Sequence, residues 1–372
     1  MDTEKLKHWI WLSMALSGAS RGVDRALEYY NCDASRIYFN KDREEYISLG
    51  VFTRLELSRL CNKSLSDAAM IAGHCAKNNI NITVYGDEAY PPGLMNIFSP
   101  PPVLYYRGTL PYFASDPIFT IVGTRKSTKD GERAAYEFAS ALSARGMVIV
   151  SGMAYGNDTQ ANLGALKGGG RTVAVLGCGV DVVYPPTNKV LMNDIIANGA
   201  VISEFPPGTF PYPQNFPQRN RIMAGISMGT LVVEAPEKSG ACITANLAME
   251  QGKDVFVIPG SIYSPTYQGC IRLMQDGVQC AFSPDDIINF YKNMLVEAGQ
   301  PAAEDDDPSL KYIDLPPVEG KIIELLLHQK KLYIDDITAA LGYSAPQILT
   351  SVMSLELKGH ITNLGGDVYC CN

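Results

Sequence analysis

Short apolar runs alternate with amphipathic segments between residues 118 and 258, and this pattern predicts a parallel sheet covered by helices. Each run is apolar at nearly every position, as expected for a strand that is buried on both faces. Each run is also followed closely by a glycine, a serine or an acid, at the strand end where open α/β sheets bind ligands. The predicted strands are Ile118–Val122, Met147–Val150, Thr172–Leu176, Ala200–Ile202, Thr230–Val233 and Val255–Ile258. We therefore predict a doubly wound α/β domain over residues 81–298.

The segments on either side of this pattern predict two smaller domains. Residues 1–80 have helical spacing with closely placed breaks, such as Ser17-Gly18 and Asn31-Cys32, which predicts a compact SAM-like or helix-hairpin-helix-like bundle. Prolines at 91, 92 and 100–102 exclude a continuous helix there and mark the passage into the sheet domain. An acidic linker follows over residues 299–310, and residues 311–372 combine helical segments with a glycine-containing hairpin. That order predicts a C-terminal winged-helix domain.

Composition places the chain among folded proteins and excludes several classes. Of 372 residues, 46% are hydrophobic and 19% are charged, which provides enough apolar surface for a sizeable core. The apolar stretch Trp9–Leu16 is too short to span a bilayer, and residues 1–8 lack the layout of a secretion signal. Nine cysteines without a CxxC pair indicate reduced thiols rather than a zinc site or a disulfide framework. We expect a soluble, cytoplasmic protein with no membrane contact and no bound metal.

The distribution of charge limits how the chain can bind nucleic acid. The net charge is −8, and residues 111–298 hold 14 basic and 16 acidic side chains. A generally basic surface is therefore excluded, so any DNA binding must depend on a few placed groups. The four histidines, His8, His74, His328 and His360, all lie outside this segment. Acid–base catalysis by histidine is thus not expected there.

Three segments at the predicted sheet edge carry groups that bind phosphate. Gly123–Thr128 combines a glycine, hydroxyls and Arg125, whereas Phe216–Gly225 places two arginines and an asparagine at the start of a helix. Lys238–Thr244 adds a cation and two hydroxyls before another helix. Helix amides and guanidinium groups bind anions well. Each segment alone also fits a structural turn or an ion pair, but together they predict a groove for several phosphates.

Other nucleotide-binding and catalytic patterns fit less well. No GxxxxGK[ST] sequence occurs, and the Gly177–Gly179 turn lacks the third glycine of a dinucleotide-binding motif. Asp158, Asp181, Glu204 and Glu234 lie near predicted strand ends or helix starts and could act as acids or nucleophiles. No histidine is available to pair with a nucleophile in this segment. We therefore interpret these carboxylates as helix caps or as groups that orient arginines.

The motifs around these groups occur in a recognisable order. They are Ile121-Val122-Gly123-Thr124-Arg125, Ser151-Gly152-Met153-Ala154, Tyr184-Pro185-Pro186-Thr187-Asn188, Ser203–Gly208, Phe216–Gly225, Ser239–Thr244 and Pro259-Gly260. Over about residues 80–290 this series resembles the DNA-processing protein A family, also called DprA or Smf. The resemblance implies an extended Rossmann-like domain that binds single-stranded DNA without a cofactor and without catalytic turnover. It also implies a homodimer that loads the RecA recombinase during natural transformation.

The resemblance assigns roles to individual residues of the groove. Arg125 and Lys189 are implied as phosphate contacts, and Arg219 and Arg221 are expected to shape the same pocket. Phe216 is expected to be a platform on which bases stack. The full set of candidate DNA-binding residues is Gly123, Arg125, Ser127, Ser151, Gly152, Lys189, Phe216, Arg219, Asn220, Arg221, Lys238, Ser239, Gly240 and Thr244.

The chain departs from the family pattern at a few positions. Tyr155 stands where a basic residue is usual, and Asn162 stands where histidine is usual. Ile271 lies in a segment that usually reads Gly-Thr-Asn-x-Leu-Ile. The phosphate-binding segments are unaffected, so these changes concern contacts with RecA or with a second subunit.

A second hypothesis is an enzyme, a nucleotide phosphoribohydrolase of the lysine-decarboxylase-like family, which has a related fold. That family carries Pro-Gly-Gly-x-Gly-Thr-x-x-Glu, whereas Pro259-Gly260-Ser261 is not followed by Gly-Thr-x-x-Glu. The DNA-binding hypothesis is therefore favoured.

The winged helix is not expected to read duplex DNA. Its predicted reading helix, Ala345–Leu357, offers only Gln347 for contacts with base edges. Residues 361–371 contain no lysine or arginine. We expect this domain to contact protein instead.

Overall fold

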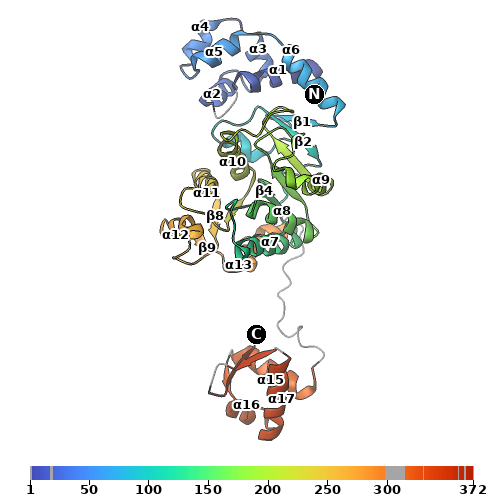
Figure 1. The fold of residues 1–372 in the computed structure, drawn as a ribbon, viewed down its shortest axis with the longest axis vertical. Helices are drawn as coiled ribbons and strands as arrows, with labels where there is room; N and C mark the ends of the chain where they lie inside the picture. The colour runs from blue at the N-terminus through green and yellow to red at the C-terminus, as the bar shows by residue number, and fades with distance from the viewer. Residues whose placement is uncertain are drawn as a thin grey trace. The chain divides into compact units, whose positions relative to one another are not determined.

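A computed structural model of the chain describes residues 2–16, 20–297, 315–329, 331–358, 360–363 and 366–371. These residues belong to two compact units, residues 1–300 and residues 301–372, which are treated separately below (Figure 1). The predicted linker over residues 299–310 lies outside the described residues. No helix within the described ranges is long and apolar enough to cross a membrane.

A nine-stranded sheet forms the centre of the first unit, in the order β1-β2-β6-β5-β4-β3-β7-β8-β9. The strands are β1 (Asn81–Val84), β2 (Val103–Gly108), β3 (Ile118–Val122), β4 (Val148–Ser151), β5 (Thr172–Val175), β6 (Gly199–Ser203), β7 (Gly229–Val232), β8 (Asp254–Val257) and β9 (Gln279–Cys280). Neighbouring strands from β6 to β9 run parallel, whereas β1 and β2 pair antiparallel. The predicted Rossmann-like fold is confirmed, and each predicted strand is present to within one or two residues.

Three strands of this sheet are not predicted by the pattern. β1 and β2 flank the proline-rich segment, which the sequence predicts only as a passage between the helical domain and the sheet domain. The prolines at 100–102 precede β2 and so do not interrupt its hydrogen bonds. The third, β9, is two residues long and pairs with β8.

The sheet is covered on both faces, which is why its strands are apolar throughout. Val173 and Val175 of β5 pack into one core with Ile222 of the helix α10 (Asn215–Ile226), whereas Ala174 packs into the other with Ile195 of α9 (Lys189–Asn198). This alternation follows from the opposite directions of successive side chains in a strand. The remaining helices of the sheet region are α7 (Lys129–Ala144), α8 (Asn157–Lys167), α11 (Gly240–Glu250), α12 (Gln268–Gln275), α13 (Pro284–Phe290) and α14 (Lys292–Glu297).

The chain reverses its direction of travel across the sheet at β3. From β3 it continues to β4, β5 and β6 on one side and then returns to β7 and β8 on the other. The loops after β3 and β7 therefore diverge and leave a crevice between them. Open α/β sheets bind their ligands at such a switch point.

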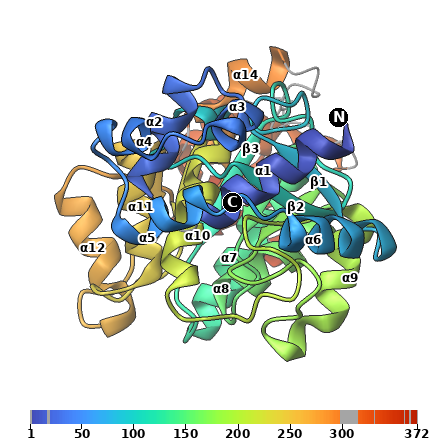
Figure 2. The same ribbon diagram turned by 90° about the horizontal axis from the view of Figure 1, so that it is seen from above.

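Six short helices precede the sheet, as the sequence predicts. They are α1 (Thr3–Ala15), α2 (Arg21–Tyr29), α3 (Ala34–Phe39), α4 (Arg43–Ser48), α5 (Arg54–Cys61) and α6 (Ser66–Lys77). Several begin at a side-chain cap, such as Asp33 before α3 and the capping box of Thr53 and Glu56 at α5. Figure 2 shows α1 beside β1 and β2, and α1 contacts β2 while α6 contacts β1.

These helices share a hydrophobic core with the sheet. Ile10 and Leu12 of α1 belong to the same buried cluster as Val103 and Tyr105 of β2, and all four are fully buried. A polar contact also joins the two regions, because the Ser99 amide donates to the Asp24 carboxylate at 3.1 Å. The boundary predicted at residue 80 thus separates helices from strands but does not divide the core.

The second unit is a winged helix, as predicted. It contains α15 (Pro317–Gln329), β10 (Leu332–Tyr333), α16 (Ile334–Leu341), α17 (Ala345–Leu357), β11 (Ile361–Asn363) and β12 (Val368–Cys371). The predicted two-stranded hairpin is instead part of a three-stranded sheet, because β10 also pairs with β12. Side chains from its three helices, including Ile322, Ile337 and Val352, are buried in its own core.

Candidate nucleic-acid interface

A cleft of about 790 Å³ lies at the switch point of the sheet. It is bounded by the loop after β3, the loop between β4 and α8, the first half of α10 and the start of α11. Of the fourteen candidate residues, the lining includes Gly123, Arg125, Phe216, Arg219, Asn220, Lys238, Ser239, Gly240 and Thr244. The structure therefore brings together residues from all three predicted phosphate-binding segments.

The loop after β3 is held in place by a buried carboxylate, Glu234. Its Oε2 accepts a hydrogen bond from the Thr128 amide at 3.0 Å, and its Oε1 accepts from the hydroxyls of Thr128 at 2.9 Å and Thr266 at 3.0 Å. The backbone carbonyl of Glu234 accepts from the Thr124 amide at 2.8 Å. Glu234 thus acts as an anchor that fixes both ends of the loop carrying Arg125, whereas the cap of α7 is Thr128 itself. No pattern in the sequence indicated that Thr266 would join it.

Two exposed cations and a helix start give the cleft its anion-binding character. Arg125 and Lys238 are both exposed, and the Arg125 guanidinium lies 4.6 Å from the centroid of the Phe216 ring. Ser239 caps α11 by accepting from the Cys242 amide at 3.3 Å. The amides of Gly240 and Ala241 precede the Cys242 amide in the first turn of α11, and neither has a hydrogen-bond partner within the helix. Because both residues line the cleft, these amides and the helix dipole favour an anion there. Glu237 is an exposed acid at the same rim.

Arg219 is in the cleft wall but is not a free cation. Its side chain is buried, and Nη1 donates to the carbonyls of Gly152, at 3.1 Å, and Val175. Burial lowers the pKa of Arg219 to about 10, and the nearby Asp158 carboxylate opposes that shift. Gly152 leaves room for this group, because an added Cβ would lie 2.5 Å from Arg219 Nη1 and from Asp158 Oδ2, and one or both side chains would have to shift. We conclude that Arg219 ties α10 to the ends of β4 and β5.

Asp158 completes this buried group. Burial raises the pKa of its carboxyl, while Arg219 and the backbone amides of Gly123 and Ala154 oppose that rise. The carboxylate therefore bridges the loop after β3 and the start of α8. None of the described residues that line the cleft is a histidine, and Asp158 is enclosed rather than presented to a ligand. The arrangement has the charges and amides to hold an anion, and its buried carboxylate is held within the cleft wall.

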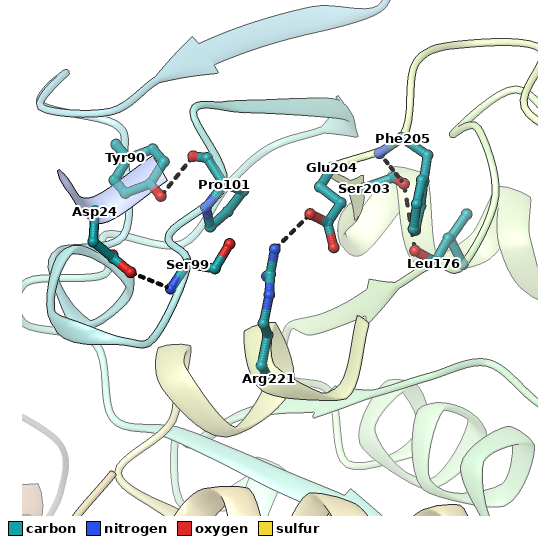
Figure 3. A network of polar contacts seen from close by, with 9 residues as sticks. All are labelled: Asp24, Tyr90, Ser99, Pro101, Leu176, Ser203, Glu204, Phe205 and Arg221. Carbon is teal, nitrogen blue, oxygen red and sulfur yellow. Dashed lines mark hydrogen bonds and ion pairs between the residues drawn. The ribbon is translucent and has the colours of Figure 1, made fainter. Parts of the chain in front are cut away.

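Arg221 does not reach the cleft, which corrects the expectation from its place in the motif. It points to the opposite side of α10, where Nη2 donates to Glu204 Oε2 at 2.6 Å. Figure 3 shows this pair near Asp24, Tyr90 and Ser99, at the junction between the first helices and the sheet. Both side chains are nearly inaccessible, at 6% and 9% exposure. Successive residues of a helix point about 100° apart. Arg219 and Arg221 are two positions apart, so their side chains point about 200° apart, to nearly opposite sides of α10.

The remaining candidates occupy mixed positions. Asn220 donates from Nδ2 to the Gly240 carbonyl at 3.0 Å and thereby joins α10 to α11. The hydroxyls of Ser151 and Thr244 are buried and donate to the carbonyls of Ile121 and Gly240. Ser127 donates to Glu132 at 3.0 Å and does not line the cleft. Lys189 begins α9 and is exposed, but it too is outside the cleft lining.

A doubly wound sheet with a cleft at its switch point that is lined by two exposed cations defines a Rossmann-like α/β protein. Comparison with protein families narrows this class. A model described as DNA recombination-mediator protein A matches residues 81–292, and one described as DprA winged helix domain matches residues 300–367. The chain belongs to the DNA recombination-mediator protein A family.

Relatives and solved structures agree with this assignment. Protein Smf of Synechocystis sp. is 45% identical over 311 residues, which cover 76% of this chain and 78% of that protein. DNA processing protein DprA of Streptococcus pneumoniae is 42% identical over 202 residues, covering 54% of this chain and 71% of that protein. The X-ray structure of S. pneumoniae DprA superimposes with a TM-score of 0.65 at 32% identity, over 76% of this chain and 97% of that one. A Helicobacter pylori DprA structure, described in terms of its single-stranded DNA binding mode, gives a TM-score of 0.52 at 28% identity over 56% of this chain and 95% of that one.

Proposed function

We propose that the protein binds single-stranded DNA with the phosphates of the strand in the cleft. Arg125 and Lys238 supply exposed positive charge, and the first amides of α11 supply further donors. The observation that carries the proposal is this convergence of two loops and a helix start at one switch point, in a chain of net charge −8. Arg219 and Asp158, which are charged but buried, support the walls of the cleft.

The role that fits this binding is recombination mediation. Family membership supports a protein that holds incoming single strands and transfers them to the RecA recombinase, as in natural transformation. We further propose that the protein acts as a homodimer in the cytoplasm and performs no catalytic turnover. The buried state of Asp158 and Glu234 favours binding over catalysis, because both carboxylates are committed to structural hydrogen bonds.

Binding of single-stranded and duplex DNA of equal length, compared by fluorescence anisotropy, tests the proposal. We expect the single strand to bind more tightly, because the cleft offers two exposed cations to one flexible backbone, whereas the 14 basic and 16 acidic side chains of residues 111–298 give a duplex no net positive charge to bind. Equal binding of both forms would mean that the cleft does not discriminate and that another surface carries the interaction.

Removal of the two exposed cations should weaken binding without unfolding the protein. We expect Arg125→Ala with Lys238→Ala to lower the affinity for single strands of every sequence to a similar extent, because phosphate contacts carry no base information. The slope of log K against log salt should become shallower by about 0.7 for each phosphate that the double variant no longer binds. Lys167→Ala removes one charge at the far end of α8 and serves as the control. Unchanged affinity and slope in the folded double variant would show that the phosphates bind elsewhere.

Removal of the winged helix should have little effect on this binding. Deletion of residues 309–372 is expected to leave single-strand affinity within a few-fold of the full chain. Gln347, the one residue of α17 suited to base contacts, uses its Oε1 to accept from Ser344 in a capping box. Lys358, just after that helix, is paired with Glu319 at 2.8 Å. Anisotropy titration of the truncated chain checks this, and loss of binding by a folded truncation would contradict it.

A further inference from the structure

The ring that the sequence suggested as a base platform is covered in the structure. Phe216 is only 9% exposed. Arg125 lies over its ring, and Tyr184 packs beside it with ring centroids 5.3 Å apart. A base could stack on Phe216 only after displacing the cation that is proposed to bind phosphate. Phe216 therefore supports Arg125, and any stacking must take place on other rings.

Two exposed aromatic rings belong to a loop that contributes part of the cleft wall. Phe210 is 64% exposed and Tyr212 is 50% exposed, and their ring centroids lie 5.6 Å apart. Both belong to the loop between β6 and α10, where they alternate with Pro211 and Pro213. These two prolines line the cleft. The rings are not part of the cleft lining themselves, but each is the direct chain neighbour of a residue that is.

The loop that presents these rings is tied down along its length. The Gly208 amide donates to Asp181 Oδ1 at 2.8 Å, and the Gly179 amide donates to the Thr209 carbonyl at 3.0 Å. At the other end, Asn215 Nδ2 donates to the Gly177 carbonyl at 3.0 Å. Prolines restrict the backbone between these anchors. A restricted backbone therefore presents two neighbouring aromatic rings to water, where a ligand could contact them.

We propose that Phe210 and Tyr212 form a stacking platform for unpaired bases of the strand whose phosphates lie in the cleft. This inference rests on the proposed function and adds the part of the strand that the cations do not contact. Every base has an aromatic face, so the platform would accept any sequence while rejecting paired bases that are stacked within a duplex. Such contacts would help a cleft lined by two exposed cations to hold a strand.

Two oligomers of equal length test the platform, one of deoxythymidine and one of abasic deoxyribose phosphate. We expect the wild-type chain to bind oligo(dT) more tightly than the abasic oligomer. Phe210→Ala with Tyr212→Ala should weaken binding of oligo(dT) by about fivefold or more, which is the lower end for loss of one stacked base. Binding of the abasic oligomer and the salt slope for oligo(dT) should not change, because no phosphate contact is removed. Tyr212→Phe should bind as the wild type does, since it keeps the ring.

The controls separate this proposal from its alternatives. Phe39→Ala removes a ring of similar exposure, 67%, from α3 and should leave binding unchanged. A folded double variant that binds both oligomers as the wild type does would overturn the platform. So would an equal loss for both oligomers, which would assign the loop to the phosphates. A change in sedimentation mass with unchanged DNA binding would also overturn it and assign the rings to contact with a second copy. If the wild-type chain binds neither oligomer, the proposed function itself fails.

Discussion

Removal of residues 2–77 is expected to abolish cooperative folding of the sheet, although these helices precede the cleft and contribute nothing to its lining. Val103 and Tyr105 of β2 are fully buried in one cluster with Ile10 and Leu12. Without the helices, one face of β1 and β2 would be exposed to water. Full burial of a single large apolar side chain contributes about 1.5–3 kcal/mol, and the whole margin of stability of a domain is only about 5–15 kcal/mol. Exposure of several such side chains should therefore exceed that margin.

Thermal unfolding followed by circular dichroism measures this effect. Deletion of residues 309–372 is the matched control, because it removes a segment of similar length that folds around its own core. The control should keep the Tm of the first unit. If the chain without residues 2–77 unfolds cooperatively at the wild-type Tm, then the helices and the sheet are independent.

Replacement of Arg221 is expected to destabilise the fold and to leave the DNA affinity of the folded molecules unchanged. Arg221→Met leaves the Glu204 carboxylate buried without its partner, and breaking a buried ion pair in this way costs about 3–5 kcal/mol. Burial already raises the pKa of Glu204, and the Arg221 guanidinium opposes that rise. The single variant should therefore favour a protonated Glu204 and lose stability near neutral pH.

Chemical denaturation at pH 7 checks this prediction in a double-mutant cycle. Combining Arg221→Met with Glu204→Leu removes both buried charges, so we expect much of the original stability to return. Anisotropy titration below the unfolding transition should give the wild-type affinity and salt slope. A shallower salt slope in the folded single variant would instead place Arg221 in contact with phosphate.

The sequence predicted the parallel strands well because burial on both faces leaves a plain apolar signature. It missed β1 and β2, whose pairing depends on partners far along the chain, Val84 with Val103 and Tyr105 with Ser203. The prolines between them dominated the local pattern.

For the site, the sequence identified the three segments but not the direction of each side chain. Arg219 and Arg221 look alike in the motif, yet one supports the cleft wall and the other pairs with Glu204 on the far side of α10. Arg125 and Lys238 lie in loops, and both side chains are exposed. Phe216 was expected to be open and is covered, whereas Phe210 and Tyr212 were not singled out, because nothing in the pattern distinguishes a loop ring that is exposed from one that is buried.

The anchoring of the Gly123–Thr128 loop by Glu234 has a consequence for the kinetics of strand exchange. A loop that is already fixed gives up little conformational entropy on binding, so nearly all of the ordering cost falls on the flexible DNA. Association should then be limited by collision and by charge rather than by rearrangement of the protein. If the cleft binds phosphates as proposed, their release needs no closing or opening step of this loop either, so we expect a strand to detach nucleotide by nucleotide while the rest stays bound. Such reversibility would suit the proposed transfer of a strand to a recombinase, because the recombinase could advance along the DNA without waiting for the whole complex to dissociate.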